Sequence, residues 1–143
     1  MRKANTSKGD FTDFDTKITP MSYEKDPLSE KIIGYCFKIH SELGPGFPAR
    51  IYHNALIVML KDNNVIYESE KEFDVIFNNK KVGKFRCDLV VEKKMILETK
   101  SLEGYIPRIF YYQVLSYLKA ANIKTRLLIN FGGKSCDVKR LSV

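Results

Sequence analysis

Two acidic residues and a lysine lie within thirteen positions of each other, between apolar segments. Asp88 comes directly before one apolar run, and Glu98 comes directly after another and is followed two residues later by Lys100. Strand side chains alternate between faces, so Glu98 and Lys100 project from the same face. If the chain turns back about Lys93, Asp88 lies directly opposite Glu98. A register one residue away leaves the two acids as diagonal neighbours.

This arrangement predicts a site for a divalent metal. Two carboxylates that face each other across a strand pair repel, unless a cation lies between them. Mg²⁺ prefers oxygen ligands and typically takes one or two carboxylates from a protein. Held by Asp88 and Glu98, it could lower the pKa of a water and polarise a phosphoryl oxygen. Lys100 could orient the attacking water or stabilise charge that develops on the phosphate. The chemistry indicated is hydrolysis of a phosphodiester bond.

A simpler interpretation is a solvated strand face without a function. Acidic and basic residues are common there, and the short pattern Glu-x-Lys has little specificity. The apolar runs beside Asp88 and Glu98 favour a function instead. They indicate core strands, where an acid costs more free energy to keep.

Helices are expected on both sides of this hairpin. Asp26 and Pro27 are typical of a helix start, and Gly44-Pro45-Gly46 ends that helix. A second helix is predicted from Pro48 to about residue 62, and a third from about 107 to 121. The residues expected to face inward are Leu28, Ile32, Ile33, Cys36, Ile39 and Leu43 in the first helix, Ile51, Tyr52, Ala55, Leu56, Met59 and Leu60 in the second, and Ile109, Tyr112, Leu115 and Leu118 in the third.

The remaining segments alternate with period two and are predicted to be strands. They are residues 65–67, 73–77, 82–91, 95–101 and 126–131, and residues 138–143 could add an edge strand. This order predicts an α/β (α+β) domain with a mixed β-sheet over residues 26–143. Residues 1–25 are polar and are predicted to form a flexible N-terminal arm.

The composition favours a nucleic-acid partner and an intracellular protein. The net charge is +7, and a basic surface gains affinity for a polyanion by releasing its counterions. The three cysteines form no CxxC pair, so neither a disulfide framework nor a zinc site is expected. No apolar run approaches the roughly 18 residues that span a bilayer. We therefore expect a cytoplasmic location and no membrane partner. The oligomeric state is open, with a homodimer among the alternatives.

Several motifs in order carry a family resemblance over about residues 28–143. They are Ile39–Gly46, Tyr52 with Ala55-Leu56, Gly83–Val90, Leu97–Lys100, Gln113–Lys119 and Leu127–Phe131. The chain resembles the GxxExxY proteins of the PD-(D/E)XK nuclease superfamily. This resemblance implies a restriction-endonuclease-like sheet flanked by helices and a Mg²⁺ (or Mn²⁺) site. The implied ligands are Asp88, Glu98 and the Thr99 carbonyl, with Lys100 as the catalytic lysine and Gln113 as a polar helix residue beside the active site.

One residue departs from the family pattern. Gly46 and Tyr52 match Gly-x-x-Glu-x-x-Tyr, but the glutamate position is Ala49. That glutamate would lie in the first turn of the second helix and help to hold the metal or its waters. Alanine keeps the helix, while the site loses about one charge and one oxygen donor. The chain is then either a naturally weakened member or a deliberately inactivated variant. Glu68, Glu70 or Glu72 could substitute, and the sequence gives no geometric reason to choose one of them.

Three functions follow from these patterns. The first is a Mg²⁺-dependent nuclease acting on DNA or RNA, and the second is a nucleic-acid-binding module without turnover. The third is a protein–protein interaction domain. His40 and His53 are expected to be packing or surface residues, with a structural hydrogen bond at His40. The aromatic run 110–112 is expected to pack on the core, and stacking on unpaired bases is the alternative.

Overall fold

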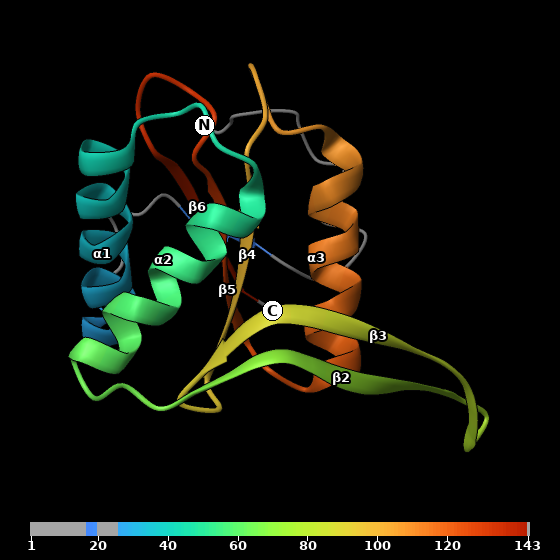
Figure 1. Cartoon of the computed structure of the whole chain (residues 1–143). Coiled ribbons are helices and arrows are strands. Elements are labelled where there is room, and N and C mark those ends of the chain that lie inside the picture. Colours follow the sequence, from blue (N-terminus) through green and yellow to red (C-terminus); the bar gives the residue numbers. More distant parts are fainter. Residues whose placement is uncertain (1–16, 20–25, 143) are drawn as a thin grey trace.

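The computed structural model describes residues 17–19 and 26–142, and these form one six-stranded sheet with helices on both faces (Figure 1). The strand order is β1-β6-β5-β4-β3-β2. Among the described strands only β4 and β5 run parallel, which confirms the predicted mixed sheet. The elements are β1 (Lys17–Thr19), α1 (Pro27–Leu43), α2 (Ala49–Asp62), β2 (Tyr67–Phe77), β3 (Lys80–Val91), β4 (Met95–Lys100), α3 (Arg108–Ala121), β5 (Thr125–Asn130) and β6 (Asp137–Ser142).

Two apolar clusters cover the two faces of the sheet. Helices α1 and α2 pack on one face, and α3 packs on the other (Figure 1). The α1/α2 cluster includes Ile32, Tyr52, Leu97 and Ile129. The α3 cluster includes Cys87, Val90, Ile96, Leu118 and Leu128. Adjacent residues of β4 and β5 therefore belong to opposite clusters, as strand alternation requires. No helix in the described part of the chain has the length and apolar character needed to cross a membrane.

The ends of α1 are those that the sequence predicted. The Asp26 carboxylate accepts hydrogen bonds from Leu28 N (3.1 Å) and Ser29 Oγ (2.8 Å) at the first turn. Gly44 adopts φ 74°, in the left-handed region, and its N–H bonds to the His40 carbonyl (2.8 Å). A residue without Cβ is favoured there, so the helix stops at Leu43.

Asp26→Ala is expected to lower the free energy of unfolding by about 1–2 kcal/mol at neutral pH. Burial acts to raise the pKa of Asp26, but the bonds from Ser29 and Leu28 and the Arg140 charge hold it below its usual value. Because the folded pKa is depressed, this stabilisation is present above the unfolded pKa and is lost as the pH falls through the folded pKa. Urea unfolding at neutral and acidic pH measures both effects. Asp26→Asn, which keeps a capping oxygen, should cost less at neutral pH. An equal cost of Asp26→Ala at both pH values would contradict the prediction.

Three predictions about the strands differ from the structure. Residues 65–67 and 73–77 were expected as separate strands, but β2 runs unbroken from Tyr67 to Phe77. Its charged middle hides the alternation, because most of β2 is exposed or only half-buried. The predicted edge strand is β6, yet β1 pairs along its outer side, so β6 is not the edge. Lys17–Thr19 thus form a strand within the predicted arm, and the rest of that arm lies outside the described residues.

Three residues predicted to face inward are exposed. Leu43, Ile51 and Ile109 have exposed fractions of 40%, 40% and 66%. Each stands in the first or last turn of its helix. At a helix end fewer neighbouring elements cover the apolar face than in the middle of the helix, so these side chains reach solvent. The other inward residues named from the sequence are buried or half-buried.

The β2–β3 hairpin leaves the body of the sheet. Figure 1 shows the two strands curving away from β4 and projecting beyond α3. The turn at the far end contains Asn78 and Asn79, with φ 51° and 62°. Asparagine tolerates this left-handed conformation better than most residues, which fits the predicted turn. The near end of the hairpin is where β3 meets β4.

Candidate active site

Strands β3 and β4 pair in the register that brings the two acids together. The pairs Leu89↔Leu97, Val90↔Ile96 and Val91↔Met95 are centred on Lys93. Continued by one residue, this register places Asp88 opposite Glu98. The predicted hairpin geometry is therefore the observed one.

The strands part at the position of the acids. β4 stays beside β5 as far as the pair Lys100↔Asn130, while β3 turns outward with β2 (Figure 1). At the parting, Asp88 N donates to Glu98 Oε1 (3.3 Å) and Thr99 N donates to Asp88 Oδ2 (2.9 Å). Thr99 Oγ1 donates to the same Asp88 oxygen (3.2 Å). Each acid therefore satisfies a backbone amide of the other strand, in place of the lost ladder bonds.

Glu98 is buried and paired with an arginine from the neighbouring strand. Arg126 Nη2 lies 2.9 Å from Glu98 Oε1, and the two side chains are 1% and 8% exposed. Burial raises the pKa of Glu98 to about 7; Arg126 opposes the shift and Asp88 adds to it. The sequence predicts an external cation between the acids. The structure places a cation of the chain itself on one of them.

Arg126 is a residue of the candidate site that the sequence did not reveal. The sequence predicts only a buried strand over residues 126–131. The signal in the sequence was a charged residue directly before an apolar run, and in the structure the four residues that follow it on β5 are all buried. A cation on such a strand needs a buried partner, because an isolated buried charge costs several kcal/mol.

Lys100 and Glu98 project to the same side of the sheet, as predicted. Lys100 Nζ lies 4.2 Å from the ring centroid of Phe110, and Arg126, which holds Glu98, lies over the ring of Tyr117. Both rings belong to α3.

Gln113 on α3 is exposed, and it follows Phe110 by three residues and precedes Tyr117 by four. Helical spacing puts it on the same stripe, and its place beside the site stays a prediction.

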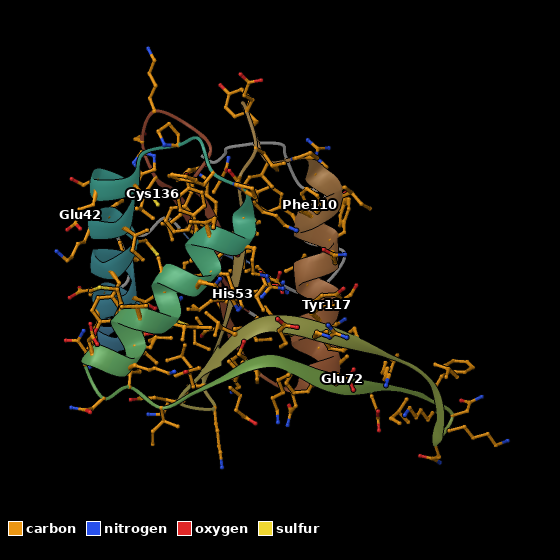
Figure 2. The ribbon with its side chains drawn as sticks, viewed as in Figure 1. Glu42, His53, Glu72, Phe110, Tyr117 and Cys136 are labelled. Carbon is orange, nitrogen blue, oxygen red and sulfur yellow. The ribbon has the colours of Figure 1, made fainter. Side chains whose placement is uncertain are left out.

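The other side of Asp88 faces α2. His53 is 3% exposed, and its Nε2 lies 3.2 Å from Ser69 Oγ. Burial lowers the pKa of His53, while the Asp88 charge opposes this shift. Asp88 also acts on the pKa of Tyr117, which burial raises. In Figure 2, His53 on α2 and Tyr117 on α3 lie on either side of β4. The acids thus lie between the two helical layers.

Of the three glutamates that could substitute for the missing one, Glu70 is the best placed. It lies between the pairs Ser69↔Leu89 and Lys71↔Cys87, and so opposite Asp88. Its φ of 55° marks a local irregularity in β2. The Glu70 carboxylate is, however, engaged by two arginines, Arg50 (2.7 Å) and Arg86 (3.2 Å). Glu68 and Glu72 form ion pairs with Lys71 and Lys84.

Buried polar contacts fix the segments beside the site. Asn130 Oδ1 accepts from Leu102 N (2.9 Å), and Asn130 Nδ2 donates to the Leu102 carbonyl (3.1 Å). This holds the chain just after Lys100. The Tyr52 hydroxyl donates to the Gly44 carbonyl and accepts from Phe47 N, which holds the loop before α2.

Two further predictions concern single residues near these segments. His40 Nε2 lies 2.9 Å from the Gly133 carbonyl, which confirms the predicted structural hydrogen bond. Phe110 and Tyr111 pack against the α3 cluster, as core packing of the aromatic run requires.

The donor chemistry of the site fits a hard cation held by two carboxylates. Asp88 and Glu98 are adjacent and supply oxygen ligands, and Mg²⁺ commonly takes no more than two protein carboxylates. Among the residues that the structure describes, no group of three or more His, Cys, Asp or Glu side chains is arranged to hold a metal. A hollow of about 450 Å³, bordered by Asp26, Glu92 and Met95, lies at the other end of β4 and does not include the acid pair. The candidate site is therefore the acid pair with Lys100.

Comparisons with known proteins concern the family and the fold of the chain. A family model described as the PD-(D/E)XK nuclease superfamily matches residues 26–141. Among solved structures, the chain is similar to SSO0001, with a TM-score of 0.53 and 23% identity. The match covers 65% of this chain and 48% of that one, so it spans about half of SSO0001. At this identity the likeness concerns the fold alone. No curated protein matches the chain.

Proposed function

The chain belongs to the PD-(D/E)XK nuclease superfamily, and from this premise we propose that it is a Mg²⁺- or Mn²⁺-dependent nuclease acting on DNA or RNA. Its motifs resemble the GxxExxY proteins within that superfamily. One observation carries the proposal: Asp88 and Glu98 meet where β3 and β4 part, with Lys100 on the Glu98 side of the sheet.

The residues of the site would have separate roles. Asp88 and Glu98 would hold the metal, with the Thr99 carbonyl as a further oxygen donor. When bound, the metal would lower the pKa of a water and polarise the scissile phosphoryl group. Lys100 would donate to the attacking water or to charge that develops on the phosphate. Gln113, on the exposed stripe of α3, would contact the substrate or an ordered water.

Metal titration and cleavage assays on the natural chain test this function. Calorimetry with Mg²⁺ and with Mn²⁺ should show binding, and labelled DNA and RNA should be cut only when metal is present. Chelation with EDTA should stop cleavage, and added metal should restore it. If no metal binding is seen even at millimolar Mg²⁺ or Mn²⁺, the proposal that the chain is a metal-dependent enzyme is wrong.

Ala49→Glu is expected to raise the metal affinity about tenfold or more and to increase cleavage. Ala49 is the first residue of α2, one turn before the buried His53. The charge of Asp88 acts to raise the pKa of His53, against the larger effect of burial. The first turn of α2 has no acidic residue. A glutamate there interacts favourably with the helix dipole, so the fold should be kept. Calorimetry and initial cleavage rates measure the two effects.

Asn54→Glu is the matched control for this variant. It adds the same charge to the same helix at an exposed position, and neither property should change. An equal gain in both variants would indicate a general effect of charge. No gain at Ala49→Glu would show that the missing glutamate is not what limits the site.

A second candidate is a nucleic-acid-binding module without turnover. The observation that favours it is the buried Arg126, which already neutralises Glu98. With a net charge of +7, its affinity for DNA should fall steeply as salt rises. Binding that responds to salt but no cleavage in any metal would support this candidate. A flat salt response would exclude it.

A further inference from the structure

The acid pair contains a cation that belongs to the fold itself. Arg126 lies on β5, in register with Ile96 of the parallel strand β4, two residues before Glu98. Its guanidinium reaches Glu98 at 2.9 Å, and its side chain is 1% exposed. Solvent therefore does little to screen this attraction.

Aromatic rings fix Arg126 in this position. Its guanidinium carbon lies 5.2 Å from the ring centroid of Tyr117. Tyr117 stacks on Phe85 (4.2 Å), and Phe85 stacks on Phe73 (5.5 Å). Figure 2 shows Tyr117 on α3 above the base of the β2–β3 hairpin. Since Tyr117 is supported by two further rings and the Arg126 side chain is 1% exposed, Arg126 has little room to move away from the acids.

When Glu98 is ionised, the charges at the site balance without an added ion. Asp88 and Glu98 contribute two carboxylates, and Arg126 and Lys100 contribute two cations on the same side of the sheet as Glu98. A divalent metal placed beside Glu98 would meet the positive charge of Arg126 at close range. It would also compete with Arg126 for the lone pairs of the same carboxylate.

We propose that Arg126 is an internal counter-ion that competes with the divalent metal for Glu98. Arg126 is a positioning residue here, because it acts on a ligand and not on the substrate. It keeps the site folded and neutral when metal is absent, and it weakens the uptake of metal. The proposal rests on the proposed function in one respect, namely that Asp88 and Glu98 form a metal site.

Arg126→Met tests the proposal by removing the charge while keeping much of the side-chain volume. The metal affinity is expected to rise by about tenfold or more, because a unit charge close to the ion is removed. The thermal midpoint without metal should fall, since a buried carboxylate loses its partner. Added Mg²⁺ or Mn²⁺ should raise the midpoint of Arg126→Met much more than that of the natural chain. Calorimetry measures the metal affinity and thermal unfolding measures the midpoint, so neither result depends on an activity assay.

Two further variants act as controls. Arg126→Lys keeps the charge and should bind metal as weakly as the natural chain. An equal gain of affinity in Arg126→Lys would overturn the counter-ion account. Arg126→Met/Glu98→Gln removes both charges and should fold without any response to metal. If Arg126→Met does not fold alone, Mn²⁺ during refolding should restore it. Failure to do so, while the double variant folds, would also overturn the proposal.

The results separate this proposal from the proposed function. If neither the natural chain nor Arg126→Met binds Mg²⁺ or Mn²⁺, there is no metal site. The proposed function and the counter-ion proposal then both fail. If the natural chain binds metal and Arg126→Met binds it no more tightly, only the counter-ion proposal fails.

Discussion

Asp88→Asn is expected to abolish metal binding and cleavage together. The change removes one of two carboxylates from the site and leaves Glu98 already shared with Arg126. Loss of the metal would remove several kcal/mol of transition-state stabilisation, a fall in rate of about 10³-fold or more. The asparagine oxygen can still accept from Thr99 N, which now bonds to Asp88 Oδ2 (2.9 Å), so the strands should stay together. Calorimetry and cleavage rates measure the losses, and circular dichroism checks the fold.

Asp74→Asn is the control for this variant. Asp74 lies on the same hairpin and pairs with Lys81 (3.2 Å) at the surface. The substitution removes the same charge far from Glu98 and should change neither binding nor cleavage. Retained cleavage in Asp88→Asn would mean that the acid pair is not the catalytic centre.

Lys100→Met is expected to separate the two properties that Asp88→Asn removes together. Cleavage should fall by about 10²-fold or more, because a donor to the water or to the phosphate is lost. Metal binding should be kept, since Lys100 is not a ligand. Methionine keeps the length of the side chain and can still pack on Phe110, which now lies 4.2 Å from the Lys100 ammonium. Single-turnover cleavage and metal calorimetry measure the two effects.

Lys94→Met controls for the loss of one positive charge. Lys94 is exposed at the turn between β3 and β4. Its removal should weaken nucleic-acid binding as much as Lys100→Met does, but leave the cleavage step intact. If both variants lose cleavage equally, Lys100 acts through net charge and has no specific role.

The hairpin and the helix ends could be predicted because local chemistry determines them. Asp26 with Pro27 begins α1 and Gly44 ends it, and these signals act within a single turn. The apolar alternation on both sides of Lys93 determined the register, and with it the meeting of Asp88 and Glu98. A shift by one residue would have turned every apolar side chain of one strand to the wrong face.

The missed features depend on contacts between distant segments. Arg126 is separated from Glu98 by 28 positions, and only the parallel pairing of β4 with β5 brings them together. The contact of His53 on α2 with Ser69 on β2 likewise joins two distant segments. The charged middle of β2 has no periodic signal, because neither of its faces is fully covered. A sequence pattern indicates which residues of one element are buried, whereas these features come from contacts between different elements.

The exchange of bonds between Asp88 and Glu98 has an evolutionary consequence. Each acid accepts a hydrogen bond from a backbone amide that the parting strands would otherwise leave without a partner. Folding alone would preserve the charge of Glu98, because it also offsets that of the buried Arg126. At position 88 it would preserve only an acceptor oxygen, which asparagine also supplies. In relatives that do not depend on a metal, asparagine is therefore expected in place of Asp88, while the glutamate is kept.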